Sequence, residues 1–277
     1  AYVLVFAGFI LTGGSLADRF GRVRMMRIGM VLFGVGSLIA SRTDSVAGLT
    51  SARVVMGFGA AIISPATLSI ITSLFDDPTA RAKAIGVWAG GSMSGIVIGP
   101  IAGGLLLSHF WWGSVFLVNL PIVVLSVPLL GALVPESKNP DAPPLDLVGM
   151  VLSTAALAVI LWATISAPEH GWTSLTTLGT YAAGCVLLVA FVAFELHNPA
   201  PLLDIRFFAE RSFVVPTMVV TAVIFMTASF SFVLTQLLQF VHGYTALQAG
   251  VRMLPMAFVL VAGGVMAPRL AARVGVR

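Results

Sequence analysis

The residue whose surroundings most suggest a functional role is an aspartate among arginines, in the stretch GGSLADRFGRVRMM. Asp18 stands where one helix is expected to end, so it can pair with Arg22 and also face a helix N-terminus, where negative charge is favoured. Gly14 and Gly21 permit a tight turn between the two helices. A basic loop that only sets membrane topology would explain the arginines, but not the aspartate or the glycine spacing. We therefore interpret this segment as a functional charge cluster.

A second charge, Arg53, lies inside the apolar stretch LTSARVVMGFGAAIISP. An arginine within a membrane helix is energetically costly and suggests a functional site by default. The alternative is that its long side chain extends to the outer surface, since it lies only about two turns from the end of that stretch. We favour the functional interpretation of Arg53, which has Gly57 one turn further on.

A third segment, GVWAGGSMSGIVIGPIAGGLLL, carries glycines at four-residue steps. Gly91, Gly95, Gly99 and Gly103 would form a stripe without side chains on one face of a helix, which suits close packing in a bilayer. Pro100 removes a backbone donor and is expected to bend the helix. Generic tight packing would explain the four-residue step, but not the rest of the pattern.

Candidates for catalysis or metal binding are weak. The four histidines fall in predicted loops or at the ends of apolar stretches, and no metal-binding or phosphate-binding motif is present in the sequence. None of the eleven acidic residues lies deep in an apolar stretch, which argues against a membrane-embedded enzyme. The single cysteine, Cys185, is expected to be an inert buried thiol. We therefore predict no metal site and no cofactor.

A weaker candidate for ligand binding is the stretch FMTASFSF and the residues that follow it. Phe225, Met226, Phe230 and Gln236 could line a cavity for lipophilic cations, because aromatic faces attract cations and methionine adapts to varied shapes. The alternative for each of them is a lipid-facing or packing role.

The composition indicates which elements must position these residues. The chain has 277 residues, of which 58% are hydrophobic and only 9% charged, whereas soluble domains carry about 25% charged residues. So few charges cannot coat a water-soluble surface, which predicts an all-α polytopic membrane protein. The net charge of +4 is spread over separate loops rather than gathered in one patch, which argues against a nucleic-acid partner.

Breaks at charged residues and at proline and glycine clusters predict nine spans. They are approximately 1–16, 28–41, 47–74, 85–107, 114–134, 147–166, 174–194, 213–235 and 247–267. One alternating set of loops holds twelve of the 15 basic residues and the other set only Arg42, which by the positive-inside rule places the first set in the cytoplasm. Those cytoplasmic segments are 17–27, 75–84, 135–146, 195–212 and 268–277.

Three signatures resemble those of the major facilitator superfamily. The first loop matches its G-x-L-A-D-R-x-G-R pattern at Gly14, Leu16, Ala17, Asp18, Arg19, Gly21 and Arg22. The third span matches a second pattern at Arg53, Gly57, Gly59, Ala60 and Ala61, although Met56 stands where the family usually has glutamine. The fourth span matches the antiporter pattern G-x(8)-G-x(3)-G-P-x(2)-G-G at Gly86, Gly95, Gly99, Pro100, Gly103 and Gly104. The last pattern is similar to that of exporters, and uptake members generally lack it.

Further stretches, among them FWWGSVFLVNLPI and PLLDIRFFAERSF, look like the fourteen-helix drug/proton antiporter branch. The resemblance covers essentially the whole chain and implies helices two to ten of fourteen, with the first helix and the last four absent. It implies an N-terminal bundle at 1–134, a cytoplasmic linker at 135–146 and a two-helix insert at 147–194. A second linker at 195–212 would lead into the C-terminal bundle, which would begin at 213–277.

The resemblance implies a proton-driven secondary transporter of the plasma (inner) membrane, monomeric, that exports hydrophobic or cationic drugs by alternating access. Gly14, Asp18, Arg19, Gly21 and Arg22 would form a conformational latch, and Arg53 and Gly57 would take part in proton or substrate coupling. The proton gradient would serve instead of a cofactor. The coupling carboxylate would lie on the absent first helix. The alternatives are a major facilitator uptake or metabolite permease and, less favoured, a membrane-embedded enzyme. A lipid-facing sensor or scaffold would need neither Arg53 nor the antiporter pattern.

Overall fold

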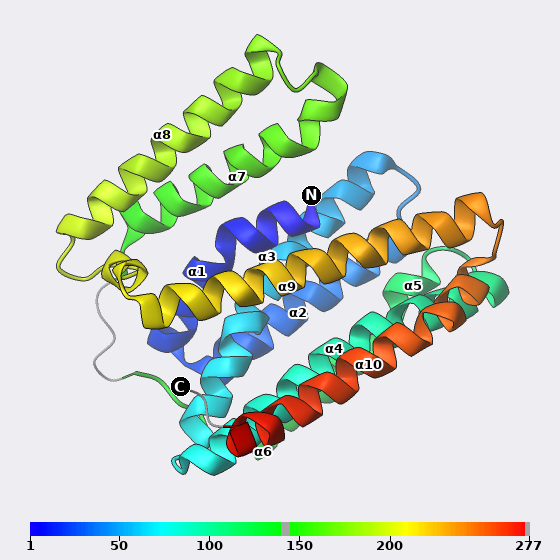
Figure 1. Ribbon diagram of the computed structural model, residues 1–277, viewed down its shortest axis with the longest axis horizontal. Coiled ribbons are helices and arrows are strands. Elements are labelled where there is room, and N and C mark those ends of the chain that lie inside the picture. Colours follow the sequence, from blue (N-terminus) through cyan, green and yellow to red (C-terminus); the bar gives the residue numbers. More distant parts are fainter. Residues whose placement is uncertain (140–144, 275–277) are drawn as a thin grey trace. The chain divides into compact units, whose positions relative to one another are not determined.

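The computed structural model describes residues 1–139 and 145–274, and within these residues it contains helices and no β-strand (Figure 1). The predicted all-α class is therefore confirmed. The helices are α1 (Tyr2–Phe20), α2 (Arg22–Arg42), α3 (Val46–Leu74), α4 (Pro78–His109), α5 (Ser114–Leu117), α6 (Asn119–Leu133), α7 (Leu147–His170), α8 (Leu175–His197), η1 (Ile205–Ala209), α9 (Arg211–Gln236), the π-helical turn η2 (Leu237–Val241) and α10 (Ala246–Val274).

Helices occupy all nine predicted spans. Seven stretches are long and apolar enough to cross a membrane, namely α1, α2, α3, the α5–α6 pair, α7, α8 and α9 with η2. Over the described residues, α4 and α10 are not apolar over a long enough stretch to meet this criterion. The protein is thus a multi-pass membrane protein, and the count of nine spans stays a prediction.

The chain forms two compact units. The first contains 1–70 and 116–211, and the second contains 71–115 and 212–277. The second unit takes α4 together with α9 and α10, so its limits differ from the predicted bundle boundary at 134. The assignment of bundles, linkers and insert stays a prediction.

Small residues let the helices of the first unit approach one another closely. Helix α1 packs along α2 and α7, α2 packs along α6, and α7 packs along α8. A methyl group on Gly59 of α3 would lie 2.5 Å from the Gly29 carbonyl oxygen of α2, and one on Gly36 would lie 2.9 Å from the Ala52 carbonyl oxygen. These contacts are typical of membrane helices, which associate through close packing of their backbones.

The prediction of a buried thiol is wrong, because Cys185 is exposed on α8. The preceding residue, Gly184, faces α7, where a methyl group would lie 2.6 Å from Ile160 Cγ1. Successive residues on an α-helix are rotated by about 100°, so Cys185 points away from that contact.

The predicted orientation can be tested by cysteine labelling of the full-length protein in a Cys185→Ser background. Single cysteines at Lys138 and Arg206 should react with a membrane-impermeant thiol reagent only from the cytoplasmic side, and one at Glu169 only from outside. All three side chains are exposed, so the side of the membrane decides their reactivity. Labelling of the Lys138 position from outside would overturn the orientation.

Candidate functional site

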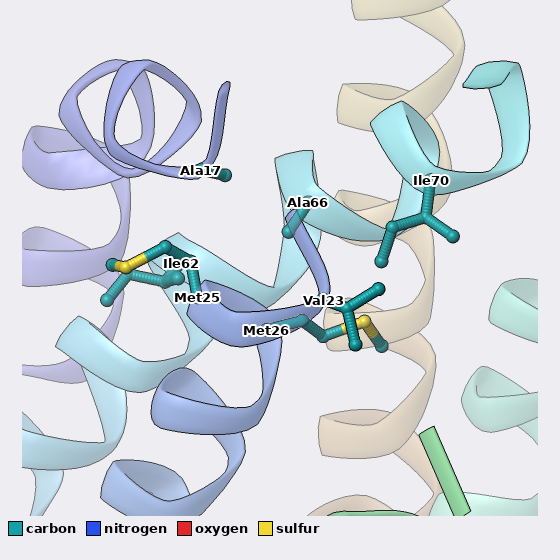
Figure 2. Packing of buried hydrophobic residues seen from close by; sticks show 7 residues of the cluster. All are labelled: Ala17, Val23, Met25, Met26, Ile62, Ala66 and Ile70. Atoms are coloured by element: carbon teal, nitrogen blue, oxygen red, sulfur yellow. The ribbon is translucent and has the colours of Figure 1, made fainter. Parts of the chain in front are cut away.

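The turn between α1 and α2 is anchored on α3 by a buried hydrophobic cluster. Figure 2 shows its seven side chains, which come from all three helices: Ala17, Val23, Met25, Met26, Ile62, Ala66 and Ile70. Burial of apolar surface is the main force that holds such a cluster together within the unit. The cluster fixes where α1 ends and α2 begins, and it thereby positions the polar residues of the turn.

At this turn Arg22 Nε donates a hydrogen bond of 2.8 Å to Asp18 Oδ1. The predicted pairing of the two residues is confirmed, and Ser69 of α3 adds a second donor, with its Oγ 3.1 Å from the same oxygen. The Asp18 side chain is 42% exposed and that of Arg22 18%. Ion pairs this exposed contribute little stability, so breaking this pair costs little free energy.

Gly21 occupies a backbone conformation that favours glycine. Its φ of 105° lies in the region that residues with a side chain rarely adopt. A methyl group there would also lie 2.8 Å from the Glu136 carboxyl carbon. Both observations explain why the turn requires glycine at this position.

The segment after α6, predicted as a plain linker, clamps the same turn. Glu136 accepts hydrogen bonds from Val23 N at 3.0 Å and Arg24 N at 2.9 Å, so it caps the N-terminus of α2. Glu136, rather than Asp18, therefore occupies the position at that helix end.

Two backbone hydrogen bonds complete this clamp. Arg22 N donates to Ser137 O at 2.9 Å, and Asn139 N donates to Asp18 O at 3.0 Å. More than a hundred residues separate the clamp from the turn along the chain, and no sequence motif indicates this contact. The rest of the predicted linker, 140–144, lies outside the described residues.

Replacing Glu136 with Ala in the full-length protein is expected to lower stability by about 1 kcal/mol, the usual loss when a helix cap is removed. Thermal unfolding of the purified protein in detergent measures this loss. Glu169→Ala, which removes an exposed carboxylate at the end of α7, is the matched control and should leave the melting temperature unchanged. Equal shifts for both variants would contradict the cap.

The remaining latch residues flank the pair. Arg19 is exposed in the last turn of α1. Gly14 lies against α3, where a methyl group would be 3.5 Å from Pro65 Cβ. The turn therefore brings all five predicted latch residues to one place, and their role as a latch stays a prediction.

Arg53 lies half-buried in α3 between two aromatic rings. Its guanidinium carbon is 5.3 Å from the centre of the Tyr2 ring and 5.7 Å from that of Phe116, distances at which cation–π attraction operates. Gly57 makes this possible, because a methyl group there would lie 2.9 Å from the Tyr2 carbonyl oxygen. Because Met56 replaces the usual glutamine, the sequence indicated no partner for Arg53. In the structure its partners are the faces of two aromatic rings.

Met56, which replaces the glutamine usual in the family, faces a different polar group. Its sulfur accepts from Ser37 Oγ at 3.9 Å, and Asn119 Nδ2 donates to the same hydroxyl at 3.1 Å. These three residues join α2, α3 and α6 through one buried and one partly buried polar contact.

The glycine stripe of α4 makes no close helix contact with the described residues of its own unit. A methyl group at Gly91, Gly95, Gly99 or Gly103, or at Gly86 of the same pattern, would meet none of their atoms within 4 Å. The close helix contact that the four-residue step predicted is therefore not found at Gly95 or Gly99 within the described part of this unit. The periodicity identifies the face of the helix, but not what covers it.

Gly104 and Pro100, in the same pattern, do contact a helix. Helix α4 packs along α10, and a methyl group on Gly104 would lie 2.7 Å from Leu247 Cα. A methyl group on Gly250 of α10 would lie 3.1 Å from the Pro100 carbonyl carbon. We call this contact of Pro100 and Gly104 with Leu247 and Gly250 the α4–α10 seam. No sequence pattern indicated that Gly250 belongs to it.

The predicted substrate residues lie on α9. The side chains of Phe225, Met226 and Phe230 are 71%, 68% and 58% exposed, and Gln236 is exposed at the end of the helix. Their role in binding stays a prediction. Among the described residues, no group of three or more His, Cys, Asp or Glu is arranged to hold a metal ion.

Comparison with known proteins relates the whole chain to transporters. It is 36% identical over 277 residues to the methyl viologen resistance protein SmvA of Salmonella typhimurium, 100% of this chain and 56% of that protein. It is 35% identical over 280 residues to the multidrug resistance protein Stp of Mycobacterium tuberculosis, covering 100% of this chain and 52% of Stp. It is 38% identical over 272 residues to the multidrug efflux pump LfrA of Mycolicibacterium smegmatis, covering 98% of this chain and 54% of LfrA.

The chain thus spans about half the length of the curated relatives it matches. The family model described as Major Facilitator Superfamily matches residues 1–277. Together with the α1–α2 turn and the membrane-length helices, this match shows that the chain belongs to the Major Facilitator Superfamily.

Proposed function

We propose that the complete protein is a proton-driven exporter of hydrophobic and cationic drugs that works by alternating access in the plasma membrane. The observation that carries this proposal is the α4–α10 seam. Pro100 and Gly104, two residues of the exporter-like pattern, lie where the α4 backbone comes close to α10, and Gly104 and Gly250 leave room for this contact. A contact between helix backbones without large side chains at the interface can close tightly, and it can separate without side chains having to move past one another.

The predicted topology gives the seam a place in the cycle. Helix α4 would begin in the cytoplasm, so Pro100 and Gly104 would lie in its outer half. The seam would then close the outer side of the transporter, while the latch at the α1–α2 turn would close the cytoplasmic side. Alternating access needs two such closures that open in turn.

Arg53 is proposed to take part in coupling. It would lie near the outer end of α3, where its guanidinium contacts two aromatic rings. A proton or a cationic substrate that arrives nearby would repel this half-buried positive charge and compete for the aromatic faces. The names of the relatives refer to resistance, efflux and methyl viologen. Lipophilic cations are therefore the substrate class that we propose.

Cells that produce the full-length protein test this proposal through ethidium accumulation. We expect less ethidium in these cells than in cells with an empty vector, and we expect the difference to vanish when a protonophore collapses the proton gradient. Higher accumulation would favour an uptake permease. Greater drug tolerance with unchanged accumulation and a chemically altered drug, detected by mass spectrometry, would favour an enzyme.

A further inference from the structure

Two carboxyl groups meet at the end of the α7–α8 helix pair, apart from the latch, the seam and Arg53. Asp146 stands immediately before α7, and Glu195 lies in the last turn of α8. Their exposed fractions are 9% for Asp146 and 3% for Glu195. The predicted span 174–194 ends before Glu195 and places it in a loop, so a buried carboxyl group was not expected at this position.

Three of the four carboxyl oxygens have donors. Asp146 Oδ1 accepts from Gly149 N at 2.7 Å, and Asp146 Oδ2 accepts from Asn198 Nδ2 at 2.7 Å. Glu195 Oε2 accepts from Leu203 N at 3.4 Å. The fourth oxygen, Glu195 Oε1, is buried and has no hydrogen-bond partner among the described residues.

The orphan oxygen lies beside Asp146. A methyl group on Gly149 would contact Asp146 Oδ2, and it would also lie 2.5 Å from Glu195 Oε1. Both oxygens therefore surround the same point, and the missing side chain of Gly149 leaves room for them. Asp146 Oδ2 is a carboxylate oxygen that can only accept when ionised, so it cannot satisfy Glu195 Oε1 without a proton.

Two ionised carboxylates cannot share a buried site at low cost, because each repels the other and both lose hydration. A single proton resolves both problems. Placed on Glu195 Oε1, it removes one negative charge and donates to Asp146 Oδ2, forming the short, strong bond of a carboxylic acid with a carboxylate. Asp146 Oδ2 has a second lone pair for this bond beside the one used by Asn198.

Among the described residues, neither Asp146 nor Glu195 forms an ion pair with a basic side chain that could neutralise it. From α1, Asp18 lines the same cavity of about 420 Å³ as Asp146, which adds negative charge. From η1 and the residue before it, Arg206 and Asp204 line a cavity of about 210 Å³ with Glu195, and their charges offset each other. On α8 itself, the His197 ring is exposed and its Nδ1 lies 2.8 Å from the Ala193 carbonyl oxygen.

We propose that Asp146 and Glu195 form a proton-binding site that holds one shared proton at neutral pH. The proton comes from water, and no other bond is made or broken. Its loss would leave two adjacent buried negative charges at the point where Asn198 and Leu203 attach the following connector to α7 and α8. The site would therefore tie the packing of this connector to cytoplasmic pH. It does not depend on the direction or substrate of transport.

Infrared difference spectroscopy of the purified full-length protein tests the site without any transport measurement. Exposed carboxyl groups are ionised at neutral pH, so only a retained proton gives a carboxylic acid carbonyl band. We expect one such band to be lost in Glu195→Gln. In Asp146→Asn it should shift in frequency, because the acceptor changes from a carboxylate to an amide. Glu169→Gln, which removes an exposed carboxylate from the other end of α7, should change no acid band.

The parent protein gives a second test that needs no variant. Folding takes up a proton that the unfolded chain releases at neutral pH, so stability should fall as pH rises and the acid band disappears. This pH dependence should weaken in Glu195→Gln. A parent protein without an acid band, or variants that neither remove nor shift one, would overturn the proposal. So would a band that sodium ions abolish, since the pair would then be a cation site.

Discussion

Replacing Asp18 with Asn in the full-length protein is expected to abolish most drug export while leaving the amount of protein in the membrane near normal. The change removes the negative charge of Asp18, whose Oδ1 accepts hydrogen bonds from Arg22 Nε at 2.8 Å and from Ser69 Oγ at 3.1 Å. It costs little stability, because the pair is partly exposed and exposed ion pairs contribute little. The loss should therefore appear in transport rather than in folding. Ethidium efflux at matched protein levels measures it.

The matched control is Asp44→Asn, which removes an exposed aspartate between α2 and α3. It should export at the parent rate. Ser69→Ala should give an intermediate result, since it removes one donor and keeps the ion pair. If Asp18→Asn exports as fast as the parent, the latch role of this turn is wrong.

Replacing Gly250 with Val is expected to force the α4–α10 seam apart. The added Cβ would lie 3.1 Å from the Pro100 carbonyl carbon, and the two methyl groups on it would need more room still. Overpacking of this kind typically costs about 1–3 kcal/mol, which is comparable to the few kcal/mol that separate two access states. The ratio of outward-open to inward-open protein should therefore change by about 5-fold to 150-fold, and coupling should loosen.

Accessibility of a single cysteine on the outer side, together with proton leak in vesicles, measures this shift. Gly104→Val, on the other side of the seam, should have the same effect. Gly99→Val is the matched control within the same helix, because a methyl group there meets no described atom within 4 Å. An equal effect of Gly99→Val would show that the glycine pattern acts as a whole rather than through the seam. If the valine variants fail to insert, the smaller change Gly250→Ala serves instead.

Features that depend on short stretches of sequence could be predicted. Membrane helices must satisfy their backbone hydrogen bonds internally, so long apolar stretches were predicted to be helical, and helices occupy every one of them. The pair of Asp18 and Arg22 lies four residues apart, a spacing that places two side chains on the same face of a helix turn. Local spacing carries this information directly.

Contacts between distant segments could not be predicted. Glu136 caps a helix that begins at Arg22, and the sequence of the linker shows only a polar, proline-containing connector. Glu195 is adjacent to the predicted end of its span, and whether it is buried depends on α7, which covers it. The glycine stripe of α4 was predicted as the packing face, whereas the close contact with α10 is made at the neighbouring Gly104, and only the arrangement of α10 determines this.

The central claim is that the complete protein exchanges protons for cationic drugs, and transport in reconstituted proteoliposomes tests it most directly. Protein would be inserted with a known orientation, ethidium would be placed at equal concentration on both sides of the membrane, and a pH gradient would be imposed with the side opposite the protein's cytoplasmic face acidic. We predict that ethidium moves to the acidic side against its own gradient while protons move the other way, and that Asp18→Asn stops both movements. Ethidium movement that is indifferent to the pH gradient, or proton movement that is indifferent to ethidium, would contradict the account.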